Sequence, residues 1–205
     1  MSFLNTVLKS FLGDKNAKDL KEVKKVVAKI KAAEPNIQTL TDDGLREKTA
    51  EFKDKIKSAA AKFTSQIDEI KEQIKNSTNV DEKEALFGKI ESLKKDSYQV
   101  EEKVLNEILP EAFALVKETS RRLAQNGEIR VTATDRDREL ASYKDFVSIE
   151  GETAVWKNSW DAAGTPVVWD MVHYDTQFIG GAVLHSGKIA AVSYTHLRAH
   201  ETPEH

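Results

Sequence analysis

Two narrow apolar seams, separated by a polar turn, constrain this chain more than any other feature. Their members follow one another at intervals of three and four residues, which places each set on one face of a helix, as in a coiled coil. They are Ile56, Ala59, Phe63, Ile67, Ile70 and Ile74 in the first seam, and Leu86, Ile90, Leu93, Val100 and Val104 in the second, where Ser97 is the one polar member. The tetrad Asn76-Ser77-Thr78-Asn79 between them is typical of a turn. The sequence therefore predicts an antiparallel helical hairpin within residues 42–108.

The outer faces of this hairpin are rich in lysine and glutamate. Such faces are usually just solvated, and we expect the same here. The alternative is an arm that binds a partner protein. The first helix of the hairpin has a clear beginning, since Thr41 is a suitable N-cap and Leu40 and Leu45 have the spacing of a hydrophobic staple.

Helices are also predicted on both sides of the hairpin. An apolar face precedes it, made of Leu20, Val23, Val26, Val27 and Ile30. Glu34-Pro35 is expected to end that helix, because a residue before proline avoids the α region. After the hairpin, Pro110 suits the first turn of a new helix, where its missing N–H is not needed. This helix would bury Phe113, Leu115, Val116 and Leu123 and end at Asn126-Gly127.

Residues 2–12 form a broad apolar helix face that Gly13 ends. From Lys9 to Lys31 there are eight lysines against three acidic residues. A basic amphipathic helix of this kind binds an anionic membrane surface. The alternative is a helix that packs on its own protein, and the residues alone leave both interpretations open.

Residues 128–168 differ in pattern from the rest. The stretches EIRVTAT and YKDFVSIEGETAVWKN alternate apolar and polar residues, and Glu150-Gly151-Glu152 fits a hairpin turn. We interpret this part as a small β-element, with an aromatic peptide-binding or ligand-binding face as the alternative. The aromatic residues are Tyr143, Phe146, Trp156, Trp160 and Trp169. Residues 135–139 have the acidic spacing of a calcium loop but lack its glycine, so a solvated turn or short helix is expected.

Composition excludes several classes of protein. The net charge of −3 argues against general nucleic-acid binding, and the absence of cysteine excludes disulfides and thiolate metal sites. No apolar run approaches the roughly 20 residues that span a bilayer. No catalytic Ser-His-Asp arrangement can be assembled, so neither catalytic nor metal-binding residues are predicted. We expect a soluble, cytoplasmic protein.

Three blocks of the chain carry a resemblance to a known family. They read EPNIQTLTDDGLREKTAEFKDKI, VLNEILPEAFALVKETSRRL and WDMVHYDTQFIGGAVLHSGKIA. In this order they resemble SecA, the motor ATPase of bacterial protein export, over residues 1–57, 103–124 and 169–190. The resemblance implies an α+β, mainly α fold: N-terminal helices with a coiled-coil-like hairpin, a small β insertion and the start of a P-loop α/β motor domain. The implied segments are 1–57, 58–102, 103–127, 128–168, 169–190 and 191–205.

The third block implies an adenine-recognition segment followed by the first strand of the motor core. In the SecA family an aromatic-Asp-x-Gln-x-x-Gly-Gly stretch recognises the nucleotide, and Gln177 occupies its glutamine position. A glutamine amide can accept from adenine N6–H and donate to N7. Met171 and Tyr174 fall where the family packs side chains against the base. Gln177, Met171 and Tyr174 are therefore the candidate ATP-binding residues.

The phosphate-binding loop of the family has no counterpart up to His205. It requires G-x-x-x-x-G-K-[ST], and the nearest candidate, Gly181 to Ile189, has the wrong spacing and no hydroxyl. Residues 188–190 instead resemble the strand before the loop. Residues 191–205, AVSYTHLRAHETPEH, resemble a translated sequencing adapter and are expected to be non-native. The alternative is a metal site at His196 and His200.

The resemblance implies the N-terminal part of an ATP-driven translocase that moves unfolded preproteins through the SecYEG channel. Its parent would use Mg-ATP, lie peripherally on the inner face of the cell membrane and contact anionic lipid, with a homodimer as one possible state. The fragment alone is expected to be inactive. Two rival classes remain: a non-enzymatic coiled-coil adaptor, and another helicase-like ATPase with a glutamine adenine sensor.

Overall fold

A computed structural model describes residues 15–190 of the chain, and they divide into two compact units. One unit contains residues 29–172, and the other contains the described residues of 1–28 and 173–205. Helix α2 (Lys15–Gln38) passes from the second of these into the first. The expectations for residues 2–12 and 191–205 lie outside the described residues.

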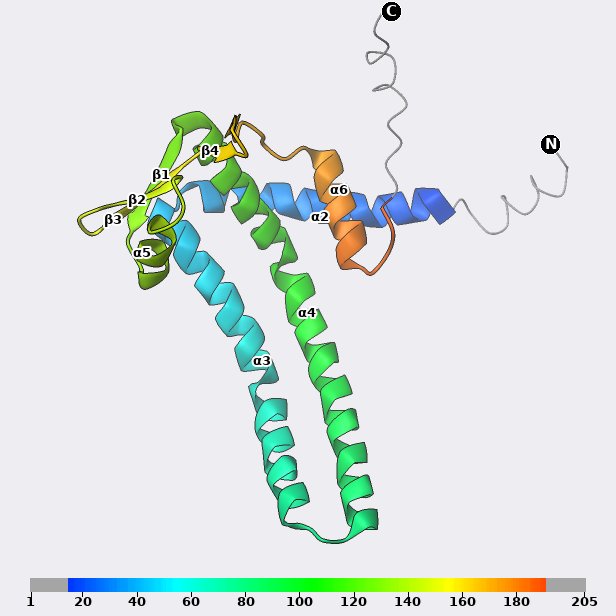
Figure 1. Ribbon diagram of the computed structural model, residues 1–205. Coiled ribbons are helices and arrows are strands. Elements are labelled where there is room, and N and C mark those ends of the chain that lie inside the picture. Colours follow the sequence, from blue (N-terminus) through cyan, green and yellow to red (C-terminus); the bar gives the residue numbers. More distant parts are fainter. Residues whose placement is uncertain (1–14, 191–205) are drawn as a thin grey trace, which may run out of the picture. The chain divides into compact units, whose positions relative to one another are not determined.

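The helical hairpin is confirmed within residues 29–172. Helix α3 (Asp42–Asn76) and helix α4 (Val80–Asn126) run side by side, joined by the predicted turn (Figure 1). At its start, Thr41 Oγ1 accepts from the Gly44 amide at 3.0 Å, as expected of an N-cap. After the turn, Asn79 Oδ1 accepts from the Asp81 amide at 2.9 Å and caps α4 in the same way. Gly127 ends α4 with a φ of 76°, which suits glycine.

Two helix boundaries expected at prolines are wrong. Helix α2 continues past Pro35 to Gln38, and Pro110 lies inside α4 rather than in the first turn of a separate helix. A proline inside a helix removes one backbone hydrogen bond and crowds the preceding turn. The turns that follow the two prolines bury Ile37, Ala114 and Leu115, and this burial favours continued helix. The expected divisions after residues 57 and 102 thus fall inside unbroken helices.

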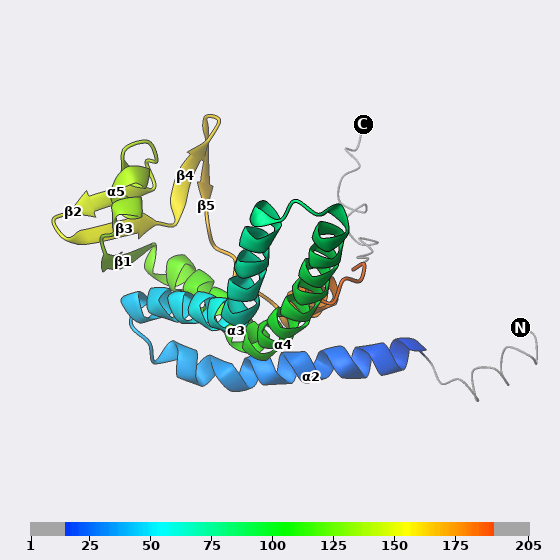
Figure 2. The same cartoon turned by 90° about the horizontal axis from the view of Figure 1, so that it is seen from below.

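The β-element of residues 128–168 is confirmed as a three-stranded antiparallel sheet and a separate β-hairpin (Figure 2). Strands β1 (Glu128–Thr132), β2 (Val147–Glu150) and β3 (Thr153–Lys157) lie in the order β1-β3-β2. The turn between β2 and β3 lies where it is predicted, at Glu150-Gly151-Glu152, and its first loop residue is Gly151, at a φ of 62°. Strands β4 (Ser159–Ala162) and β5 (Thr165–Val168) pair with each other.

Hydrogen bonds attach the sheet to the start of α3. The Asp43 carboxylate accepts from the backbone amide and the hydroxyl of Thr132, both at 2.8 Å. Arg46 donates to the Thr132 carbonyl at 3.0 Å and makes a two-bond contact with Asp137, at 2.7 and 3.0 Å. The sheet and the start of the hairpin are therefore joined by charged groups.

Asp137 corrects the expectation of a solvated segment. Residues 135–141 do form a short helix, α5 (Asp135–Ala141), but Asp137 is only 2% exposed. Burial alone would raise the pKa of this carboxyl, yet hydrogen bonds from Arg46 and Thr134 lower it to about 2. Trp156 also donates its indole N–H to Asp137, at 3.1 Å. One buried carboxylate thus connects α3, α5 and β3.

The smaller unit contains helix α6 (Asp175–His185) together with the first half of α2. The strand expected at residues 188–190 is not formed: these residues have no regular structure. A strand needs a neighbouring strand to pair with, and the described residues provide none at this position. Gly187, at a φ of 70°, instead ends α6, and the Lys188 amide donates back to the Val183 carbonyl. Within residues 15–190, no helix is long and apolar enough to cross a membrane.

Candidate functional site

Two of the three candidate site residues lie at the first turn of α6. Tyr174 is the N-cap, in an extended conformation, and Gln177 follows three positions later. The Gln177 side chain turns back toward the helix start, where its Oε1 accepts from the Tyr174 amide at 2.8 Å. This bond satisfies an amide near the helix end, where amides lack partners within the helix. It also holds the glutamine side chain in one orientation.

The opposite face of α6 anchors the helix. Phe178 is 1% exposed, and the His173 ring stacks on it with centroids 6.0 Å apart and planes 12° from parallel. Ala182, one turn further, is also buried. Tyr174 is 76% exposed and Gln177 is exposed as well. The described part of the protein therefore presents these two side chains to solvent from a fixed helix terminus.

Met171 belongs to the other unit and is held by separate contacts. The Trp169 indole N–H donates to the Met171 carbonyl at 2.9 Å. Trp169 is in turn hydrogen-bonded to Asn158, whose backbone carbonyl accepts from the Trp169 amide at 2.6 Å. The Met171 side chain is 59% exposed. The backbone around Met171 is thus fixed, while its thioether is free to contact a ligand.

The exposed groups match the chemistry of a purine base. The Gln177 amide has two N–H donors, and its oxygen has a second lone pair beside the one that accepts from Tyr174. An adjacent donor and acceptor of this kind fit the N7 and N6–H₂ edge of adenine. A tyrosine ring and a methionine thioether are suitable groups to pack against the flat face of a base. Adenine recognition by these three residues stays a prediction.

The glycines of the third block do not form a phosphate-binding loop. Gly180 and Gly181 lie within α6, and Gly187 lies in the turn that ends it. A phosphate cradle needs a run of backbone amides that converge on one point, whereas amides within a helix donate along its axis. Across residues 15–190 no group of three or more His, Asp or Glu side chains could hold a metal ion.

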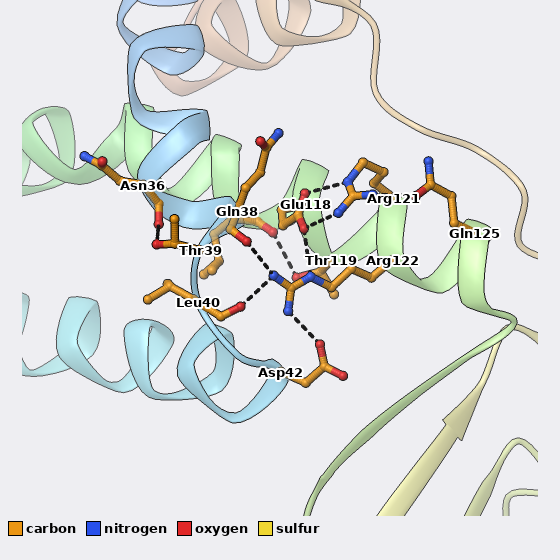
Figure 3. A network of polar contacts seen from close by, with 11 residues as sticks. Asn36, Gln38, Thr39, Leu40, Asp42, Glu118, Thr119, Arg121, Arg122 and Gln125 are labelled. Carbon is orange, nitrogen blue, oxygen red and sulfur yellow. Dashed lines mark hydrogen bonds and ion pairs between the residues drawn. The ribbon is translucent and has the colours of Figure 1, made fainter.

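Sequence reasoning missed a charged cluster where α2, α3 and α4 meet (Figure 3). Its centre is Glu118, which is 3% exposed and accepts from Arg121 at 2.6 and 2.7 Å and from Arg122 at 2.7 Å. Arg122 also pairs with Asp42 at 2.7 Å. The same guanidinium donates to the backbone carbonyls of Gln38 and Leu40, at 3.2 and 2.6 Å. We call these residues the α2–α4 cluster.

The electrostatics of the cluster favour its charged form. Hydrogen bonds from Arg121 and then from Arg122 lower the pKa of Glu118, against the effect of burial. Burial would lower the pKa of Arg122, but its bonds to Asp42 and Glu118 raise it. The four-residue spacing of Glu118 and Arg122 is typical of an ion pair on one helix, and it can be recognised in the sequence. Their connection to residues 38–42, some 80 positions earlier, had no signal in the sequence.

Comparison with known proteins places the chain in a family. A family model described as "SecA DEAD-like domain" matches residues 8–194. The chain is 48% identical over 190 residues to the protein translocase subunit SecA of Flavobacterium psychrophilum, and 49% identical over 190 residues to that of Christiangramia forsetii. It is 47% identical over 189 residues to that of Bacteroides fragilis. The chain belongs to the SecA family.

The matches cover 92–93% of this chain but only 17% of each of the three relatives. No solved structure matches the chain. The family assignment confirms the resemblance and sets aside the two rivals, the non-enzymatic coiled-coil adaptor and another helicase-like ATPase with a glutamine adenine sensor. The chain corresponds to the N-terminal part of a SecA-like protein.

Proposed function

We propose that this chain is the N-terminal part of an ATP-driven motor that moves unfolded preproteins through the SecYEG channel. One observation supports this most: nearly the whole chain is 47–49% identical to proteins named protein translocase subunit SecA. In this proposal the whole protein works in the cytoplasm, peripherally on the inner face of the cell membrane. It hydrolyses Mg-ATP with a loop that follows the segment described above.

Within that motor, Gln177 selects adenine, and Tyr174 and Met171 pack against the base. The base contacts alone are too weak to retain a nucleotide. Two hydrogen bonds to a base contribute about 1–3 kcal/mol of discrimination, whereas a micromolar site needs about −8 kcal/mol. Most of the remainder comes from the phosphates, which backbone amides, a lysine and Mg²⁺ grip in P-loop proteins. Residues 1–205 alone should therefore neither bind ATP tightly nor hydrolyse it.

A longer chain, extended through the phosphate-binding loop, tests the role of Gln177. Gln177→Ala should reduce the preference for ATP over GTP about tenfold, while phosphate affinity changes little. Gln177→Glu separates the two contacts to adenine, because a carboxylate still accepts from the Tyr174 amide and from adenine N6–H but has no N–H for N7. It should weaken base binding, keep the preference for adenine over guanine, whose O6 is an acceptor, and keep the helix.

Thr176→Ala is the matched control, since Thr176 is an exposed neighbour in the same helical turn. Competition binding with ATP and GTP measures the preference, and circular dichroism measures the helix. An unchanged preference in Gln177→Ala would remove this residue from base recognition, and a lost preference in folded Gln177→Glu would contradict its role as the acceptor of adenine N6–H. Tight ATP binding by residues 1–205 would contradict the proposal that the missing loop is essential.

A second part of the proposal concerns the membrane and the partner proteins. Helix α2 exposes Lys21, Lys24, Lys25 and Lys29, for which no ion pair exists among the described residues. Each basic residue near an anionic bilayer contributes about 1 kcal/mol. Replacing all four with glutamine should weaken co-sedimentation with anionic vesicles, and salt should weaken it in the parent chain. Equal binding to neutral vesicles would contradict this role. Sedimentation of the full-length protein tests the homodimer.

A further inference from the structure

A pocket of about 430 Å³ lies between the start of the hairpin and the three-stranded sheet, within residues 29–172. We call it the hairpin–sheet pocket. Its wall on the sheet includes Val131 and Trp156, and its wall on α4 includes Leu115 and Leu123. Pockets that hold small organic ligands have volumes of about 300–1,000 Å³ and mostly apolar walls. This pocket has both properties.

The walls are fixed before any ligand arrives. The Trp156 indole donates to Asp137, and Asp137 holds Arg46, another lining residue, through two bonds. Leu115 and Val131 are buried at 6% and 5% exposure. A ligand would therefore spend little binding free energy on ordering side chains, which favours affinity.

The charges around the pocket are compensated except for one. Arg46 is neutralised by Asp137, and Asp42 is neutralised by Arg122 at 2.7 Å. Lys157 is the remaining charged residue of the lining. Its cross-strand neighbour Glu128 is paired with Arg130 at 2.8 Å, and among residues 15–190 no ion pair to Lys157 is found. Asp43, next to the lining, already accepts two hydrogen bonds from Thr132. The pocket is thus apolar, with one uncompensated cation at its edge.

We propose that the hairpin–sheet pocket binds a small organic anion that has an apolar body and one carboxylate, as a medium-chain fatty acid has. The apolar body packs between Trp156 and Leu115, and the carboxylate pairs with Lys157. This charge complementarity disfavours cations and neutral apolar molecules. None of the residues that line the pocket belongs to the adenine-recognition segment, residues 169–190.

Decanoate tests the proposal in the full 205-residue chain. Isothermal titration calorimetry should give saturable binding with one site per chain, and added salt should weaken it. Decyltrimethylammonium, which has the same tail and the opposite charge, should bind about tenfold more weakly or not at all. Trp156 should report the binding of decanoate through a change in fluorescence.

Three variants locate the site. Lys157→Glu should weaken decanoate binding about tenfold or more. Lys144→Glu is the matched control: it makes the same change in charge at an exposed lysine of the same region that does not line the pocket, and it should bind normally. Val116→Trp should block the pocket, because Val116 lines it and is half exposed, which leaves room for the larger side chain without disturbing the core. Circular dichroism checks that each variant folds.

Several results would overturn the proposal. They are the absence of saturable binding below about 1 mM decanoate, equal binding of the cationic analogue, and equal losses in Lys157→Glu and Lys144→Glu. Normal binding by folded Val116→Trp would have the same effect. Binding of an acidic, apolar peptide without binding of decanoate would identify the pocket as a groove for a protein segment and would also contradict the proposal.

Discussion

The two ends of the helical hairpin are held together by different interactions. At the base, where the sheet joins, Arg122 and Arg46 link segments far apart in the sequence and contact the buried carboxylates of Glu118 and Asp137. Toward the tip, the ion pairs of residues 68–94 connect only neighbours three positions apart on the same helix. Those pairs are well exposed, with side chains 57–73% accessible.

This difference indicates where the stability of the hairpin lies. Exposed ion pairs contribute little, because water and salt screen them. A charge buried with its partners is costly to isolate, because removing one partner leaves an uncompensated charge in a poorly solvated place. Mutations at the base should therefore be far more damaging than similar mutations at the tip. The four predictions below test this contrast in order of expected effect.

Arg122→Ala should have the largest effect. It removes the cation that contacts Glu118, Asp42 and the carbonyls of Gln38 and Leu40. Loss of one partner from a buried charged pair destabilises by about 3–5 kcal/mol. Urea denaturation followed by circular dichroism measures the free energy of unfolding.

Arg121→Ala is the matched control for this variant. Arg121 contacts Glu118 as Arg122 does, but it makes no hydrogen bond to residues 38–42. Its loss should cost about half as much, because Arg122 still neutralises Glu118. Equal losses in both variants would mean that the contacts to residues 38–42 add nothing to stability.

Phe52→Ala and Phe63→Ala compare apolar packing at the base and toward the tip. Phe52 is 6% exposed, whereas Phe63 is only half-buried. Truncation of a buried phenylalanine costs about 3 kcal/mol or more, and we expect about 1 kcal/mol at Phe63, where less area is lost from the interior. Thermal unfolding should separate the two variants clearly. Similar melting temperatures would refute the contrast between base and tip.

Acid should weaken the base through Asp137. Its pKa is about 2 in the folded protein, below the ordinary value of 3.8. The charged form of Asp137 therefore stabilises the fold at pH values above 3.8. This stabilisation, about 2 kcal/mol, is lost as the pH falls from about 5 to about 2. The difference in unfolding free energy between the parent chain and Asp137→Asn should shrink over this range. A difference that does not vary with pH would show that Asp137 is not the titrating group.

Lys94→Ala should have the smallest effect. Lys94 pairs with Glu91 at 2.9 Å, and both side chains are well exposed. Pairs of this kind contribute about 0.3–0.5 kcal/mol on a helix. The change in unfolding free energy should stay below about 0.5 kcal/mol. A loss as large as that of Arg122→Ala would remove the distinction between the two ends.

The local parts of the fold could be predicted from the sequence. The three-four spacing gave the hairpin, Thr41 gave the start of α3, and the alternation around Gly151 gave β2 and β3. The helix boundaries at Pro35 and Pro110 were wrong, because burial in the following turns outweighs a local preference. The Arg46–Asp137 pair joins residues 91 positions apart, and a pair at that distance has no periodicity to reveal it.

The candidate site, like the fold, could be predicted only in part from the sequence. The motif indicated Gln177, Tyr174 and Met171 as the candidate residues, and the structure shows Tyr174 and Gln177 exposed at one helix terminus. The bond from the Tyr174 amide to Gln177 was not anticipated, although a glutamine three residues after an N-cap is a known capping pattern. The hairpin–sheet pocket had no signal in the sequence, because its walls come from three separate stretches of the chain.

The unbroken course of α3 and α4 makes the hairpin a lever. Helix α3 has 35 residues, which at about 1.5 Å per residue gives an arm of about 50 Å. A tilt of about 5° at its base would move the tip by about 4 Å, nearly the rise of a full helical turn of about 5.4 Å. The α2–α4 cluster and Asp137 both bind the base of the hairpin. A small rearrangement of the contacts at either place would therefore produce a large displacement of the hairpin tip.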